Sequence, residues 1–264
     1  MSESADAPVV EIEQRGRVRI LWLNRPRQRN ALSSALVDAL HQGVRDAEVD
    51  EGTGAVVLAG RGRVFCAGGD LKGSMGAQGG FVAAHEGRGR YAEFLAALPA
   101  ASVPIVAALH GDAMGGGLGL AAACDVIVAE SGVRLGTPEI KLGLFPWIIL
   151  AVLQRDVPRK KLAELVYTGG HWDAATAERI GLVNHVVEAG QALERAVSIA
   201  AVMASRSPAI LKLGKRAFHR IADQPYEDAL AFMHGQLSLN LLTEDAMEGI
   251  SAFLQKREPD WKGR

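Results

Sequence analysis

The sequence predicts an α/β fold that is followed by a helical C-terminal region. Apolar runs with strand character alternate with segments of helical spacing, and the order strand, strand, helix recurs about four times before residue 190. Runs that are apolar throughout, such as 55–59 and 105–109, indicate strands buried on both faces of a sheet. The rest of the chain shows only helical patterns. We therefore expect a core over 1–206 and a helical region over 207–264 that packs on the core or on a neighbouring subunit.

The expected strands are short and mostly apolar. The first two flank the turn signal Arg15-Gly16-Arg17, which predicts a hairpin. The full set covers residues 9–12, 18–23, 55–59, 105–109, 125–129, 133–135 and 183–187.

The expected helices follow from apolar side chains at helical spacing and from capping residues. Ser33 or Ser34 can cap the first helix, Asp173 can cap a later one, and Gly181 ends that helix. Residues 72–90 are rich in glycine and are expected to form a mobile loop. The helices cover about 34–47, 91–98, 117–123, 158–167, 173–180, 191–205, 208–221, 226–241 and 244–256.

Composition is that of an ordinary globular protein, with 48% hydrophobic and 22% charged residues among 264. A net charge of −1 argues against a nucleic-acid partner, and Cys66 and Cys124 alone cannot build a disulfide framework. No signal peptide is evident in residues 1–8, and no membrane span is expected because no uncharged apolar stretch reaches 18 residues. The small number of cysteines favours a reduced, cytoplasmic setting. The seven histidines lack zinc-helix spacing, so we expect no metal.

Two glycine-rich segments carry the chemistry. One runs from Phe65 to Lys72 as FCAGGDLK, and the other from His110 to Gly119 as HGDAMGGGLG. Each follows a predicted buried strand, and its small residues let the backbone approach a ligand closely. The second also opens a helix, where amides lack partners. Taken singly, each segment could equally be an ordinary turn, and the second lacks the lysine and serine or threonine of a phosphate loop.

Together, these segments resemble the two signature regions of the enoyl-CoA hydratase/isomerase (crotonase) family. The similarity extends over roughly residues 9 to 258 and is specific as an ordered set. Further matching pieces are Leu23-Asn24-Arg25-Pro26, Arg29-Asn30-Ala31-Leu32, Cys124-Asp125-Val126, Thr137-Pro138-Glu139, Gly181-Leu182-Val183-Asn184 and the tail from Glu248 to Arg257.

The resemblance implies a crotonase-like spiral of ββα repeats with a C-terminal helical trimerisation region, assembled as a homotrimer or a dimer of trimers. It implies an acyl-CoA substrate, with coenzyme A as part of that substrate and no separate cofactor. The amides of Ala67 and Gly116 are expected to form an oxyanion hole, with Glu139 as acid and base. Residues expected to contact the substrate are Arg25, Arg27, Ala67, Gly68, Gly69, Asp70, Leu71, Lys72, Gly115, Gly116, Gly119, Trp147, Phe253 and Lys256.

The sequence departs from the family pattern at Gly119. Hydratases of this family carry a first glutamate there and a second at the position of Glu139, so this chain keeps one of two. A single carboxylate suffices to move a proton between two carbons, whereas adding water usually needs a second group. Apolar neighbours such as Ile140 and Leu142 are expected to raise the pKa of Glu139; without the resemblance, Glu139 could be a solvated loop carboxylate. Asp112 could replace the missing group, although a turn role is the simpler interpretation.

Pro146-Trp147-Ile148-Ile149 is a second departure, because relatives often have glycines after this proline. These bulky side chains either narrow the acyl pocket or add to the core. The resulting hypotheses are hydration of a 2-enoyl-CoA or isomerisation of a 3-enoyl-CoA in fatty-acid or related metabolism. The alternatives are a catalytically impaired CoA-binding or RNA-binding homologue, and a decarboxylase or carbon–carbon lyase of a specific acyl-CoA.

Overall fold

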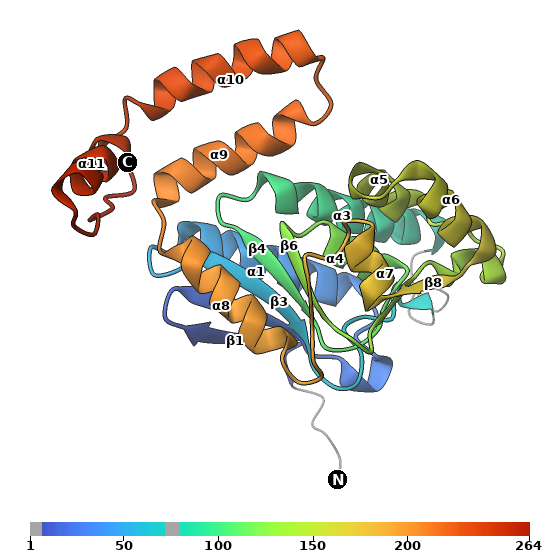
Figure 1. Cartoon of the computed structure of the whole chain (residues 1–264). Coiled ribbons are helices and arrows are strands. Elements are labelled where there is room, and N and C mark those ends of the chain that lie inside the picture. The colour runs from blue at the N-terminus through green and yellow to red at the C-terminus, as the bar shows by residue number, and fades with distance from the viewer. Residues whose placement is uncertain (1–6, 72–79) are drawn as a thin grey trace.

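The computed structural model describes residues 7–71 and 80–264. The predicted contact residue Lys72 and the first part of the predicted mobile loop therefore lie outside the described residues. The described chain forms a body of sheets and helices from which a helical arm projects (Figure 1).

The body is built on two sheets. The larger has the strand order β1-β2-β3-β4-β6-β9 and is parallel except for the β1–β2 hairpin, which confirms the predicted hairpin. Gly16 turns this hairpin with a φ of +57°, a conformation that suits glycine. The smaller sheet has the order β5-β7-β8. The strands are β1 Val10–Arg15, β2 Val18–Leu23, β3 Ala55–Gly60, β4 Ile105–Leu109, β5 Ala113–Met114, β6 Val126–Glu130, β7 Arg134–Gly136, β8 His171–Asp173 and β9 His185–Val187.

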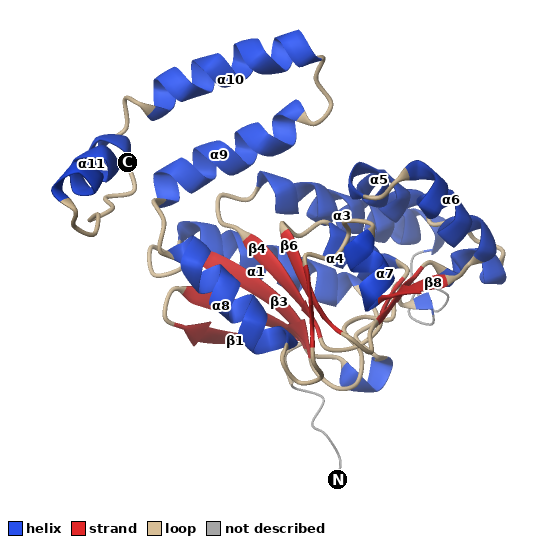
Figure 2. Cartoon of the chain, viewed as in Figure 1, coloured by secondary structure: helices blue, strands red, loops and turns tan. Residues whose placement is uncertain are grey.

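Helices cover both faces of the larger sheet (Figure 2). Helix α8 lies on one face and places alanines at every fourth position, Ala192 to Ala204, against β-strand residues such as Val57 and Val106. The opposite face packs on the larger core cluster, in which Leu58 is fully buried. Because successive strand side chains point to opposite faces, the continuous apolar runs of β3 and β4 supply both layers.

Most helices begin and end close to their predicted residues. Ser33 caps α1 through the amide of Leu36, and Asp173 caps α7 through that of Thr176, as their side chains predict. The helices are η1 Pro26–Gln28, α1 Ser34–Val49, α3 Gly80–Ala100, α4 Gly116–Ala122, η2 Pro138–Leu142, α5 Trp147–Asp156, α6 Arg159–Thr168, α7 Ala174–Arg179, α8 Ala192–Ala204, α9 Pro208–Ile221, α10 Tyr226–Asn240 and α11 Glu244–Gln255.

Two helices differ from the sequence prediction. Helix α3 begins at Gly80, so residues 80–90 are helical and the prediction of a loop there is wrong. Its glycines Gly87 and Gly89 lower helix propensity, but packing of α3 against α1 and α9 overrides that preference. Helix α5 was not predicted, because its first residues read as a bulky insertion after Pro146.

The C-terminal arm consists of α9, α10 and α11, with α10 running back beside α9 (Figure 1). Many of its large apolar side chains are exposed in the single chain, among them Phe218, Leu230, Leu237 and Phe253. Helix α8 ends at Ala204 and α9 begins at Pro208, close to the predicted division at 206 and 207. That division into two functional regions stays a prediction.

Within the described part of the chain, no single helix is long and apolar enough to cross a membrane. One pair, α8 with α9, passes by length and composition together but is bent by 108°.

Candidate functional site

The two glycine-rich segments lie side by side, as their positions after β3 and β4 predict. A parallel bridge joins Cys66 to Ala113, and the amide of Met114 donates to the carbonyl of Cys66 at 3.0 Å. On its other side the first segment pairs with the residue before α1, since Leu32 and Gly69 form a second parallel bridge. The segment from residue 66 to 70 therefore lies between the residues that precede α1 and strand β5.

Amide directions in this segment correct one prediction. The N–H of Ala67 donates to the carbonyl of Arg29 at 3.0 Å, and that of Asp70 donates to the carbonyl of Leu32 at 3.2 Å. The Gly68 amide contacts the sulfur of Cys66. The prediction that Ala67 supplies an oxyanion-hole amide is therefore wrong, because its only donor is already engaged by the protein's own carbonyl.

Gly69 and Gly116 are the pair whose amides remain open. In the described part of the chain, no hydrogen bond engages the N–H of either residue. The two lie close together, since a Cβ atom added to Gly116 would be 3.6 Å from the nitrogen of Gly69. Gly68, with a φ of +99°, breaks the extended conformation between the engaged Ala67 and Gly69. The geometry thus moves the predicted pair from Ala67 to Gly69 and keeps Gly116.

Glu139 lies against Gly115, the residue that precedes Gly116 of this pair. It belongs to η2 and its Oε1 would be 2.7 Å from a Cβ atom at Gly115, where φ is +52°. Its Oε2 is buried without a hydrogen-bond partner among the described residues. Burial raises the pKa of Glu139 above the usual glutamate value. The prediction of a solvated loop carboxylate is excluded for this conformation.

The source of that desolvation differs from the prediction. The side chains of Ile140 and Leu142 are exposed, so they cannot supply it. The carboxylate is instead desolvated by the backbone of the Gly115 turn and the surrounding core. Asp112 is also engaged elsewhere, because it accepts from the Arg134 amide at 3.0 Å and pairs with its guanidinium at 2.5 Å. It therefore ties the chain before β5 to the start of β7 in this structure.

Gly119 has no space for a side chain. A Cβ atom there would lie 2.2 Å from Cγ2 and 2.7 Å from Cβ of Ile149, well inside contact distance. Ile149 belongs to α5 and is buried in the core. The bulky residues after Pro146 thus have different roles: Ile149 fills the volume beside Gly119.

Trp147, by contrast, is 76% exposed in the single chain, and its ring is tilted by 50° against that of Phe145, with centroids 4.8 Å apart. It lines a cavity of about 480 Å³ between α3 and α5, together with residues such as Leu95 and Ile148. The structure does not bring Trp147 into contact with the open amides. Its role in substrate binding stays a prediction.

Among the basic residues before α1, Arg25 has internal partners. The guanidinium of Arg25 donates to the carbonyl of Ala31 at 2.5 Å and pairs with Asp70 at 2.9 Å. Both side chains are largely buried, so this pair anchors the segment that carries Gly69. Arg27 and Leu71 are exposed at the surface. Contacts of any of these residues with coenzyme A stay predictions.

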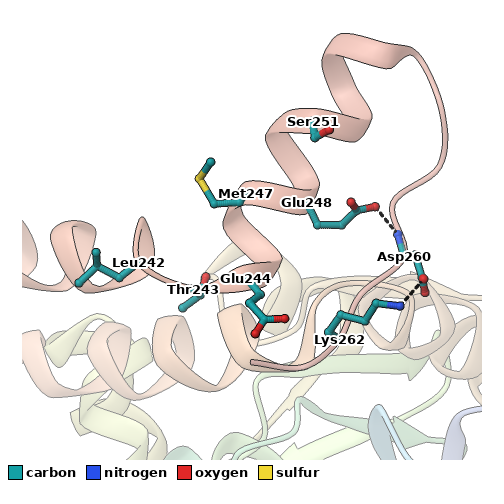
Figure 3. A pocket seen from close by; sticks show the side chains of 8 residues that line it. All are labelled: Leu242, Thr243, Glu244, Met247, Glu248, Ser251, Asp260 and Lys262. Carbon is teal, nitrogen blue, oxygen red and sulfur yellow. Dashed lines mark hydrogen bonds and ion pairs between the residues drawn. The ribbon is translucent and has the colours of Figure 1, made fainter.

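Phe253 and Lys256 lie on the arm and not at the open amides. Phe253 is 82% exposed, and Lys256 ends α11 with a φ of +54°. Helix α11 and the C-terminal residues line a cavity of about 560 Å³. Figure 3 shows the side chains around it, among them Met247, Glu248 and Lys262. Neither predicted residue lines it. Within one chain, α10 and α11 lie away from α4, the helix that begins at Gly116 (Figure 1).

Two residues of the site were not singled out for it from the sequence. Tyr91 of α3 donates its hydroxyl to the carbonyl of Gly116 at 2.5 Å. Ile149 was predicted only as one of several bulky residues. Neither belongs to a signature segment; the one available signal was that Gly119 lacks a side chain and needs a larger neighbour to fill its space. Among the described residues, no group of histidine, cysteine, aspartate and glutamate side chains could hold a metal ion.

Comparison with known proteins agrees with this architecture. The family model described as enoyl-CoA hydratase/isomerase matches residues 13–264. A probable enoyl-CoA hydratase of Rhizobium meliloti is 37% identical over 257 residues, covering 96% of this chain and 97% of its own. The 2,3-dehydroadipyl-CoA hydratase of Escherichia coli is also 37% identical, covering 96% and 98%.

Solved structures give the same result. An enoyl-CoA hydratase from Mycobacterium smegmatis superposes with a TM-score of 0.91 at 34% identity, covering 97% of this chain and 99% of its own. The human enoyl-coenzyme A hydratase domain-containing protein 3 also has a TM-score of 0.91, at 30% identity, covering 97% and 100%. The ββα body with its helical arm is thus the crotonase fold. The chain belongs to the enoyl-CoA hydratase/isomerase family, whose enzymes act on acyl-CoA thioesters.

Proposed function

We propose that this protein shifts the double bond of a 3-enoyl-CoA by way of a thioester enolate, with Glu139 as its single acid and base. One observation carries this proposal. The carboxylate of Glu139, with an unpartnered buried oxygen, lies against the Gly115–Gly116 turn, while Ile149 fills the space in which hydratases of the family hold their other glutamate.

The proposed reaction needs only these groups. The thioester oxygen accepts hydrogen bonds from the amides of Gly69 and Gly116. Glu139 takes a proton from the α-carbon, and the electron pair moves onto the carbonyl oxygen as the enolate forms. The protonated carboxyl then returns the same proton to the γ-carbon, which restores the carbonyl and leaves the double bond conjugated with it. Atoms and charge balance without water or a cofactor.

Two physical effects support this assignment. Preorganised amides aimed at a developing oxyanion typically contribute about 10²- to 10³-fold per donor. A raised pKa suits a carboxyl group that must both take up and release a proton near neutral pH. Gly119 offers no second group for activating water, and Ile149 leaves little room for one there.

Hydration of a 2-enoyl-CoA is the second candidate, and the names of the relatives favour it. The Rhizobium meliloti and Escherichia coli proteins are both called hydratases. In that reaction Glu139 would have to activate water and protonate the α-carbon in turn. The acyl group and the pathway are left open by both candidates.

Assays with 3-enoyl-CoA and 2-enoyl-CoA substrates of several chain lengths test the proposal. Glu139→Gln should lower isomerisation by about 10²- to 10⁴-fold, the usual contribution of a positioned acid or base. Glu188→Gln, an exposed glutamate in the loop after β9, serves as the matched control. Unchanged isomerisation in Glu139→Gln refutes the role of this residue. Rapid hydration without isomerisation favours the second candidate, and binding of acyl-CoA without turnover favours a non-catalytic homologue.

The arm is proposed to assemble the chain into a trimer or a dimer of trimers. Its exposed apolar side chains, such as Leu237 and Phe253, support burial against other copies, because large exposed apolar patches mark interaction sites. Phe253 and Lys256 would then contact the substrate of a neighbouring subunit. Light scattering gives the mass, and a monomer at micromolar concentration would contradict this assembly. A cytoplasmic location and the lack of a separate cofactor stay predictions.

A further inference from the structure

Tyr91 places a polar group against the Gly116 peptide. Its hydroxyl donates to the Gly116 carbonyl at 2.5 Å, and it also lies 3.6 Å from the position of a Cβ atom on Gly116. The same oxygen lies 3.2 Å from a Cβ position on Gly119. Helix α3 thus reaches across to the first turn of α4 through one phenol group.

The first turn of α4 needs such an outside contact. Three of its first four residues are glycines, Gly116, Gly117 and Gly119, which lose more backbone entropy than other residues when they are ordered. On the preceding side, the amide of Gly115 donates to the carbonyl of Gly136 at 2.8 Å. Together with the Tyr91 bond on the following side, this anchors the two peptide units that flank the one carrying the Gly116 N–H.

We infer that Tyr91 is a positioning residue for the oxyanion hole: by holding the Gly116 carbonyl, it keeps the Gly116 amide aimed at the substrate oxygen. This inference rests on the function proposed above. The hydroxyl acts as a neutral donor. Its burial raises the pKa of Tyr91 well above the usual tyrosine value, so it keeps its proton throughout the working range of Glu139.

The effect should fall on turnover and not on binding. An amide that is aimed correctly stabilises the oxyanion of the transition state more than the neutral carbonyl of the substrate. Removing the tether with Tyr91→Phe should therefore lower kcat by about 10-fold, the value of one net hydrogen bond, and leave KM within about twofold. The ring stays in place, so the apolar packing of α3 is retained.

The decisive measurement uses acetoacetyl-CoA, whose enolate has its own near-ultraviolet absorption. The wild-type protein should bind it partly as the enolate. Tyr91→Phe should bind a smaller enolate fraction, while its affinity for coenzyme A alone stays the same. The fraction is calculated per bound ligand, so partial loss of folded protein does not alter it. Tyr226→Phe, the same change at an exposed tyrosine on the arm, is the matched control.

The outcomes distinguish the positioning role of Tyr91 from the proposed function itself. An equal enolate fraction in wild type and Tyr91→Phe overturns the positioning role while the oxyanion hole stands. No enolate band in the wild type refutes the proposed function itself. If Tyr91→Phe does not fold, fluorotyrosine labelling replaces it, because the chain has only three tyrosines. With Tyr167 and Tyr226 changed to Phe, the only fluorine resonance comes from Tyr91. This resonance should shift when acetoacetyl-CoA binds and should not shift when coenzyme A binds. The same shift with both ligands overturns the inference.

Discussion

Glutamate introduced at Gly119 would restore the second carboxylate of the hydratases, but the structure predicts that the single change fails. Its Cβ atom would meet Ile149 at 2.2 Å and 2.7 Å, and atoms this close must move apart. Ile149 is only 3% exposed, so it cannot swing into solvent. Overpacking of a buried site costs about 1–3 kcal/mol. For a chain of this size, that loss lowers Tm by roughly 2–10 °C.

Removing the obstacle should reverse part of this cost. In Gly119→Glu with Ile149→Ala, the new side chain occupies the volume that the isoleucine leaves. We expect the two changes to be non-additive by about 1–3 kcal/mol in favour of the double variant. Gly235→Glu is the control, because Gly235 lies in α10 with open space around its Cβ position and should tolerate the same substitution.

The assay is a double-mutant cycle of unfolding at fixed protein concentration, followed by 2-enoyl-CoA hydration. We expect hydration to increase in the double variant and not in Gly119→Glu alone. If Gly119→Glu is as stable as the wild type and gains hydratase activity by itself, then Ile149 does not fill this space and the steric argument fails.

Three further predictions concern the amides, the base and the anchoring pair. Gly116→Val should abolish activity, because its Cβ atom would lie 3.0 Å from Leu32 and next to the Gly69 amide. Gly69→Ala should stay active, because the space around its Cβ position is open. Steady-state kinetics in which Gly69→Ala is inactive and Gly116→Val is active would contradict the assigned pair. Glu139→Gln should raise Tm at neutral pH, because the raised pKa of Glu139 means that its charged form destabilises the folded state. The gain should vanish below the ordinary glutamate pKa, where the carboxyl is protonated in both the folded and the unfolded protein. A difference in Tm that does not change with pH would argue against this. Arg25→Met should lower the unfolding free energy by about 1–3 kcal/mol in denaturant titrations, because it removes the guanidinium that pairs with the largely buried Asp70 carboxylate. An unchanged value would show that the pair is not an anchor.

The order of elements could be predicted because it depends on local patterns. The apolar runs of β3 and β4, the caps Ser33 and Asp173, and the helices of the arm all follow from spacing within a few residues. The failures arose where packing overrode propensity. Residues 80–90 are helical despite their glycines, because α3 packs on α1 and α9.

The sequence by itself determined the α/β class, the two glycine-rich segments and Glu139 as the retained carboxylate. Only the tertiary structure decided which amides are open, because an N–H is engaged or free according to a partner far along the chain: Arg29 engages Ala67 and leaves Gly69 open. The same holds for the contact of Ile149 with Gly119, which depends on how α5 packs against α4. Which carbonyl an amide donates to, and which side chain fills a space, depend on residues that are close in the fold and distant in the sequence. A local sequence pattern therefore does not reveal them.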